Sequence, residues 1–165
     1  MQEKQTKMKN DYNFLSHKGQ LLLDKKQYKK AKSIYDTIIE NFPNQFFGWY
    51  NHGVCALHLE SIQEAKESFH KALSLRPDDS YTLNELSLIH FKLKEFSLAQ
   101  NLIQKALLID PNNATLHNTH GIIAFNEGAY SVAQKSFQKA LELRPTFKEA
   151  KLNLEDCYEY TRVVK

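Results

Sequence analysis

The tripeptide Leu-Arg-Pro occurs at residues 75–77, within SLRPDD, and again at residues 143–145, within ELRPTF. The two copies are 68 residues apart, and the prolines of the chain divide that distance evenly. All four of them are spaced by 34 residues: Pro43, Pro77, Pro111 and Pro145. A constant spacing of this kind predicts an internal repeat, which has to be recognised before any single element is assigned.

Small, aromatic and branched side chains return at the same interval as the prolines. Agreement in five independent rows indicates that the whole 34-residue unit repeats. The rows are Ala31, Ala65, Ala99, Ala133; Gly19, Gly53, Ser87, Gly121; Tyr28, Ile62, Phe96, Tyr130; Tyr35, Phe69, Ile103, Phe137; and Ile38, Ala72, Ala106, Ala140.

Within one unit the apolar spacing is helical. Leu83, Leu86 and His90 follow the i, i+3, i+7 pattern of one helix face. The same period continues at residues 96–106 after a short polar break, so each unit predicts two helices. Proline and its Asn or Asp neighbours end the second helix, because proline lacks the backbone N–H and clashes with the preceding turn. The fold class is therefore all-α, built from helical hairpins.

The rows of small residues have a packing function in this arrangement. Glycine inside a helix costs about 1 kcal/mol relative to alanine, so its return at Gly19, Gly53 and Gly121 requires a reason. We expect Gly or Ser in the first helix and Ala in the second to let the two backbones approach closely, where a larger residue would be strained by roughly 1–3 kcal/mol.

These features together resemble the tetratricopeptide repeat family, whose 34-residue helix–turn–helix units carry a small residue in the first helix, Ala and an aromatic residue in the second, and a closing proline. The resemblance implies a right-handed superhelical solenoid. It divides the chain into a polar N-terminal extension (1–11), four units (12–45, 46–79, 80–113, 114–147) and a C-terminal capping helix with a tail (148–165).

Departures from the family pattern are few. They are Ser87 in the glycine row, Ile38 in a row of small residues, and histidines where the family has larger apolar side chains: His52, His90, His117 and His120.

The last helix is expected to close the array. Leu154 and Tyr158 stand in core rows, whereas Lys151 and Glu155 stand where a further second helix would pack. A repeat array must end in a face that tolerates water. Residues 148–161 are therefore predicted to cap the array.

The resemblance also implies that the first helices line a concave surface that holds a peptide or a partner helix. Each first helix carries a second stripe of side chains beside its packing stripe, available for such a contact. Phe91, Phe125, Tyr50 and Leu57 are the expected anchors, and Asn84 and Asn118 are expected to bind a partner backbone. The predicted groove residues are Phe47, Tyr50, Asn51, Val54, Leu57, Tyr81, Asn84, Leu88, Phe91, Asn118, Ile122 and Phe125.

Two details qualify the predicted groove. At the capping helix the stripe becomes Leu152, Asp156 and Glu159, which suggests a basic residue at one end of the ligand. No cation faces units two to four, which argues against the clamp for a C-terminal carboxylate known in one subgroup of the family. The simpler alternative is that neighbouring side chains cover these aromatic residues.

The charge distribution is uneven. The net charge is +3, and residues 1–32 hold nine Lys against three acidic residues. A solvated helix face explains them better than a nucleic-acid site, so no nucleic-acid partner is predicted. The chain has no membrane span or secretory signal, so we predict no membrane insertion and a cytoplasmic location.

Candidate chemistry is sparse. His117 and His120 lie one turn apart, a spacing that can supply two metal ligands, but histidines hydrogen-bonded within the core are the preferred interpretation. Cys55 and Cys157 lie three periods apart and are expected to be unpaired packing residues. No catalytic motif converges, so we predict no catalytic residue, no metal, no cofactor and no enzymatic activity.

Two functions agree with these features. The first is a monomeric scaffold or adaptor that binds a protein or peptide partner in the groove. The alternative is a specialised chaperone or assembly factor for a secretion or pilus system. Self-association through the exposed edge of the first unit is a third hypothesis.

Overall fold

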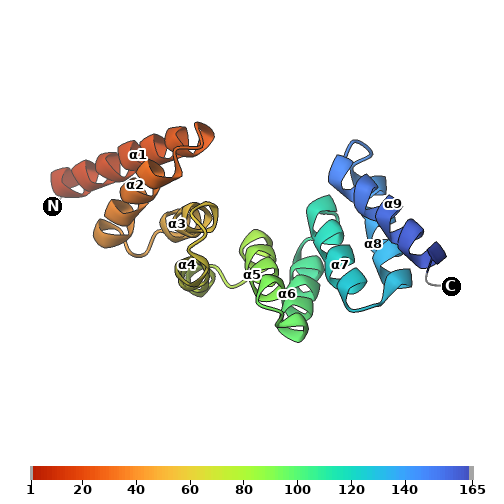
Figure 1. The fold of residues 1–165 in the computed structure, drawn as a ribbon. Helices are drawn as coiled ribbons and strands as arrows, with labels where there is room; N and C mark the ends of the chain where they lie inside the picture. Colours follow the sequence, from red (N-terminus) through yellow and green to blue (C-terminus); the bar gives the residue numbers. More distant parts are fainter. Residues whose placement is uncertain (1, 164–165) are drawn as a thin grey trace. The chain divides into compact units, whose positions relative to one another are not determined.

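The computed structural model describes residues 2–163, with side chains from residue 11 onward, and all regular structure in this range is helical (Figure 1). The prediction of an all-α repeat fold is confirmed. The helices are α1 (Gln2–Asp24), α2 (Tyr28–Asn41), α3 (Phe46–His58), α4 (Ile62–Leu75), α5 (Ser80–Lys92), α6 (Phe96–Ile109), α7 (Ala114–Asn126), α8 (Tyr130–Leu143) and α9 (Lys148–Val163).

The helices form four hairpins, α1–α2, α3–α4, α5–α6 and α7–α8, followed by α9. They divide into two compact units, Met1–Pro77 and Asp78–Lys165. In the first unit α3 packs against α2, and in the second α7 packs against α6 and α9 against α8. Residues 2–11 of the predicted extension continue helix α1 without a break.

The turn inside each hairpin uses a left-handed residue, a feature that the repeat pattern did not predict. The residues are Lys26, Glu60, Lys94 and Gly128, with φ between 55° and 77°, and they lie 34 residues apart. The following amide bonds back across the turn, as in Gln27 N to Leu22 O at 2.9 Å. Only the fourth turn has the glycine that this conformation favours, so the residue types of the other three turns did not indicate a left-handed residue.

Glycines pack against aromatic rings. A Cβ added at Gly53 would lie 2.9 Å from the ring of Phe69, and one at Gly121 would lie 2.5 Å from Phe137. Close packing of the glycine row is therefore correct. The glycines of this row lie against the aromatic rings of the second helix.

Two departures from the repeat are each matched by a change of size in a residue packed beside them. Ser87 replaces glycine in the hairpin whose second helix carries Ile103 where the other three carry an aromatic ring. Ile38 replaces a small residue, and Gly48 lies opposite it: a Cβ at Gly48 would be 2.8 Å from Ile38 Cγ2. A larger side chain on one helix is thus matched by a smaller one on its neighbour.

The Leu-Arg-Pro segments end the second helices, with proline two residues beyond the last helical residue. The guanidinium of Arg76 lies 4.4 Å from the ring centroid of Phe46 at the start of α3. The equivalent Arg144 reaches Thr115 Oγ1 at the start of α7, at 3.3 Å. Both arginines therefore reach back to the first helix of their own hairpin and hold the open end of the hairpin together.

The residues after the closing prolines begin the next helix. Asp79 caps α5, with its carboxylate accepting from the Thr82 amide at 2.7 Å. Asn113 caps α7 and accepts from the Thr115 amide at 3.0 Å. These side chains satisfy amides that would otherwise lack partners at helix starts.

Helix α9 matches the expected cap in part. Lys151 and Glu155 are exposed and 3.8 Å apart, and Leu154 is partly buried. The expectation for Tyr158 was wrong: its ring is exposed, and its hydroxyl accepts from Gln138 on the neighbouring helix α8. The buried residues of α9 are Ala150 and Cys157.

Candidate partner-binding surface

The predicted groove residues all lie on first helices. Those at 47–57 belong to α3 of the first unit, and those at 81–91 and 118–125 belong to α5 and α7 of the second. On α3, Phe47 is exposed, while Tyr50, Val54 and Leu57 are partly buried. The Tyr50 ring stacks on Phe46, with centroids 5.8 Å apart.

In the second unit two predicted residues line a pocket. Ile122 and Phe125 of α7 lie with Phe137 of α8 around a cavity of about 130 Å³. The lining also includes Asn126 of α7 and Asn153 and Asp156 of α9. The structure therefore joins the apolar stripe of α7 to the acidic stripe of the capping helix, and adds Asn126, Phe137 and Asn153, which were not among the predicted groove residues.

Phe125 is held by other aromatic rings. Its centroid lies 5.4 Å from that of Tyr130 and 5.4 Å from that of Tyr160, both edge-on. The two tyrosine rings are 5.2 Å apart. Such contacts fix the orientation of Phe125 beside the pocket. Tyr160 had no predicted role.

The two groove asparagines are more buried than expected. Asn84 is 4% exposed and Asn118 is 8% exposed. Asn118 Oδ1 accepts from Asn153 Nδ2 at 2.9 Å, so this carbonyl joins α7 to α9. Asn84 Oδ1 is buried without a hydrogen-bond partner among the described residues. Burial also raises the pKa of the adjacent Glu85.

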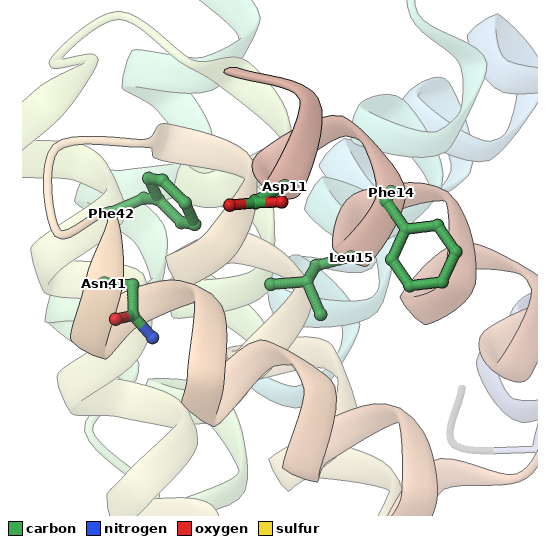
Figure 2. Close-up of a pocket in the computed structure, with 5 residues that line it drawn as sticks. All are labelled: Asp11, Phe14, Leu15, Asn41 and Phe42. Atoms are coloured by element: carbon green, nitrogen blue, oxygen red, sulfur yellow. The ribbon is translucent and has the colours of Figure 1, made fainter. Parts of the chain in front are cut away.

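A second pocket, of about 410 Å³, lies in the first unit (Figure 2). It is lined by Asp11, Phe14 and Leu15 of α1 and by Asn41 and Phe42 at the end of α2. None of these residues was predicted to form a site, although the exposed edge of the first unit was a predicted feature. Phe14 is 67% exposed.

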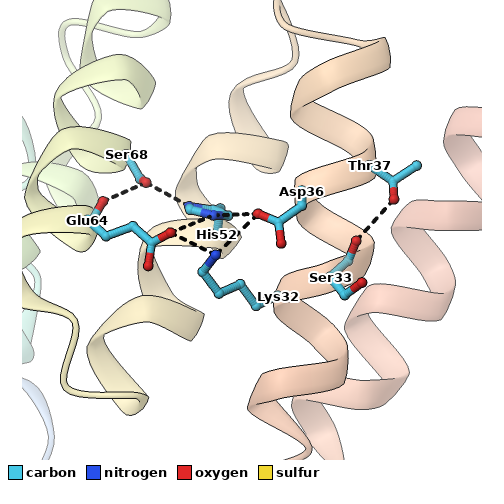
Figure 3. A network of polar contacts seen from close by, with 7 residues as sticks. All are labelled: Lys32, Ser33, Asp36, Thr37, His52, Glu64 and Ser68. Carbon is cyan, nitrogen blue, oxygen red and sulfur yellow. Dashed lines mark hydrogen bonds and ion pairs between the residues drawn. The ribbon is translucent and has the colours of Figure 1, made fainter.

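A polar network links α2, α3 and α4 (Figure 3). The His52 ring lies between Ser68 Oγ, 2.7 Å from Nδ1, and Asp36 Oδ1, 2.9 Å from Nε2. Lys32 Nζ lies 2.7 Å from Glu64 Oε1 and 3.3 Å from Asp36 Oδ1. Burial, together with the charge of Lys32, lowers the pKa of His52.

Serine, histidine and aspartate in contact are the components of a hydrolase triad. Here Ser68 is 2% exposed and His52 is 4% exposed. A nucleophile needs access to its substrate, and a buried hydroxyl between three helices has none. The arrangement serves packing between hairpins.

The histidines considered as metal ligands make hydrogen bonds within the fold. His117 Nε2 donates to the Pro111 carbonyl at 2.8 Å. His120 Nδ1 lies 2.8 Å from Ser136 Oγ, and its Nε2 lies 3.2 Å from Gln100 Nε2. Among the residues with described side chains, no group of three or more His, Cys, Asp or Glu is placed to hold a metal ion.

Both cysteines are buried and unpaired, Cys55 in the first unit and Cys157 in the second. Burial raises the pKa of the Cys55 thiol to about 12 and also raises the pKa of Cys157. Neither thiol is poised to react, because the reactive form is the thiolate. No helix in the described range combines the length and hydrophobicity needed to cross a membrane.

Family models match most of the chain. One tetratricopeptide repeat model matches residues 48–79, 80–113 and 114–147, and a second matches residues 15–44. The chain belongs to the tetratricopeptide repeat family. Tetratricopeptide repeat proteins are generally non-enzymatic interaction scaffolds, and membership of the family supports a general role in protein interaction for this chain.

One curated relative is similar in sequence to part of this tetratricopeptide repeat protein. It is the tetratricopeptide repeat-containing protein trd-1 of Caenorhabditis elegans, 32% identical over 91 residues. The match covers 54% of the chain and 12% of the relative, so the chain spans only a small part of that protein's length.

Solved structures share the fold at low sequence identity. The chain matches PilF of Pseudomonas aeruginosa with a TM-score of 0.83 at 17% identity, covering 94% of this chain and 71% of that one. It matches MamA with a TM-score of 0.74 at 20% identity, covering 87% and 84%. It matches YrrB, described as having an unusual peptide-binding site, with a TM-score of 0.70 at 24% identity, covering 90% and 76%.

Proposed function

We propose that this tetratricopeptide repeat protein is a non-enzymatic adaptor that holds a peptide or helical segment of a partner protein against the first helices of its second unit, α5 and α7. The pocket between α7, α8 and α9 carries this proposal. Ile122 and Phe125 line it, and both are partly exposed while also packing against the core of the α7–α8 hairpin.

The burial pattern supports this assignment. Leu88, Phe91, Ile122 and Phe125 are partly exposed, although each lies on a helix whose other face is fully buried. Apolar side chains gathered at a hollow on a surface usually mark a contact site. YrrB, a structural neighbour, is described as binding a peptide, which agrees with this use of the fold.

The buried asparagines change which variant tests the proposal best. Asn84→Ala would disturb a buried position, so its effect on binding would be mixed with an effect on stability. Ile122→Ser replaces one apolar residue of the pocket lining, at a partly exposed position. Leu108→Ser is the matched control, because Leu108 is highly exposed on α6 and lies outside the pocket.

The experiment is affinity capture with the full chain from its native cells, quantified by mass spectrometry for the wild type and both variants. We expect one set of proteins to be recovered with the wild type and with Leu108→Ser and to be lost with Ile122→Ser, at a temperature at which circular dichroism shows both variants to be folded. Equal recovery with Ile122→Ser would show that the pocket is not the binding site.

The chaperone alternative makes a separate prediction about the captured partner. A chaperone would raise the soluble yield of an aggregation-prone partner on co-expression, and Ile122→Ser would reduce that yield. An adaptor would bind a partner that is already soluble without it. Soluble and insoluble fractions of the partner, measured with and without the chain, separate the two functions.

A further inference from the structure

The surface of the second unit changes from apolar on α7 to acidic on α9. Two repeat rows run from α5 through α7 to α9: Leu88, Ile122, Asp156 and Phe91, Phe125, Glu159. In both rows the residues on α5 and α7 are apolar and the residue on α9 is acidic. We call Asp156 and Glu159 the acidic end of the surface.

The pocket lies where the apolar residues of α7 meet the acidic residues of α9. Its apolar lining is Ile122, Phe125 and Phe137, and its polar lining includes Asp156. At about 130 Å³ it is smaller than the roughly 300–1,000 Å³ typical of small-molecule sites. Its size suits a single aliphatic side chain from a partner.

The carboxylates of the acidic end are available to a ligand. Among the residues with described side chains, neither Asp156 nor Glu159 forms an ion pair, whereas Glu155 on the same helix lies 3.8 Å from Lys151. Asn153, which also lines the pocket, donates a hydrogen bond to Asn118. Carboxylates accept hydrogen bonds and attract cations, so they favour Lys or Arg and repel an acidic segment.

We infer that the partner segment of this surface carries an aliphatic side chain that fills the pocket and, within one helical turn of it, a Lys or Arg that pairs with Asp156 and Glu159. This inference rests on the proposed function and specifies the ligand of the same site. The aliphatic group supplies the buried contact. The cation sets orientation and excludes acidic segments.

The test begins with a selection that uses the full chain as bait. Random twelve-residue peptides displayed on phage are selected on the wild type, and enriched sequences are synthesised. Their affinity is then measured by fluorescence anisotropy for the wild type and for three variants. These are Asp156→Lys with Glu159→Lys, Ile122→Ser, and a charge-matched control, Glu142→Lys with Glu155→Lys, which are exposed residues outside the two rows.

We expect enriched peptides to pair an aliphatic residue with a nearby Lys or Arg. Reversing the acidic end should weaken them about tenfold, because exposed ion pairs contribute modestly and repulsion replaces attraction. The control should change affinity by less than about twofold. Replacing the basic residue of a peptide with Glu should restore its binding to the Asp156→Lys, Glu159→Lys variant.

The remaining outcomes separate the inference from the proposed function. Peptides that need Ile122 but bind equally to the wild type and to the Asp156→Lys, Glu159→Lys variant would overturn the cation requirement and leave the adaptor function standing. If no enriched peptide depends on Ile122, both the inference and the assignment of this surface are wrong.

Discussion

Gly121 shows how tightly a single position is constrained. A Cβ there would lie 2.5 Å from Phe137 Cε1, closer than side-chain carbons approach, so an alanine must displace the ring. The third hairpin shows another solution to the same geometry, with Ser87 in the first helix and Ile103 in the second, both fully buried. The two rows are therefore coupled: a larger residue in one requires a smaller residue in the other.

This coupling predicts a compensating pair of substitutions. Gly121→Ala should lower the free energy of unfolding by about 1–3 kcal/mol, because the extra methyl group overpacks the hairpin. Phe137→Ile alone should also destabilise, because it leaves a gap in the core. In the double variant we expect a loss clearly smaller than the sum, measured by urea unfolding as a double-mutant cycle. Strict additivity would contradict the coupling.

At the scale of elements, the links between successive hairpins differ along the chain. In the first unit His52 of α3 contacts Asp36 of α2 and Ser68 of α4. In the second unit His120 of α7 contacts Gln100 of α6 and Ser136 of α8. The histidine–serine pair is the same in both, but only the first link includes charged groups.

The first link predicts a pH dependence of stability. His52 faces Lys32 and Asp36 on α2 and Glu64 and Ser68 on α4. Its pKa is lowered from 6.5 in the folded protein, so the unfolded chain binds more protons in the window below that value. Stability contributed by the neutral ring is therefore present at pH above about 6.5 and is lost as pH falls toward the folded pKa.

The variant His52→Leu with Ser68→Leu tests this prediction. It copies the pair Leu86 and Leu102, which occupy these positions in the third hairpin, and leaves Lys32 paired with Asp36 and Glu64. We expect the wild type to lose more free energy of unfolding than the variant between pH 7.5 and pH 5.5 in urea titrations. Equal losses would show that His52 does not titrate with unfolding in this range.

At the scale of the whole molecule, the first hairpin lacks a preceding hairpin in the described chain. Phe14 and Leu21 of α1 are 67% and 44% exposed. Their repeat equivalents on α7, Leu116 and Ile123, are fully buried, and α7 packs against α6. The edge of the first unit therefore exposes side chains of the kind that elsewhere join hairpins.

We nevertheless expect the chain to be a monomer at tens of micromolar concentration. Lys18 shares the α1 face of Phe14 and Leu21, Lys25 follows in the turn directly after α1, and the charges of both lysines oppose pairing of two copies of this face. Multi-angle light scattering would measure the mass. A larger species that Phe14→Ser with Leu21→Ser returns to monomer would contradict this expectation and make the edge a self-association surface.

The candidate site was predicted only in part. Ile122 and Phe125 could be named in advance, because a second apolar stripe on a helix is visible in the order of residues. The hydrogen bond between Asn153 and Asn118 could not be predicted, because it depends on how two side-chain amides on different helices are oriented. The Phe14 pocket was also missed, because a repeat pattern marks which residues would face a neighbour but not whether a neighbour is present.

The sequence by itself determined the 34-residue repeat, the helical hairpins and the rows of the core. These follow from local spacing, since proline ends a helix and apolar periodicity chooses the buried face wherever they occur. Only the tertiary structure decided the polar partners and the hollows: His52 between Asp36 and Ser68, and the pocket formed by α7, α8 and α9. Hydrogen bonds and cavities depend on distances of a few ångströms between side chains of different helices, and the periodicity of one helix does not specify them.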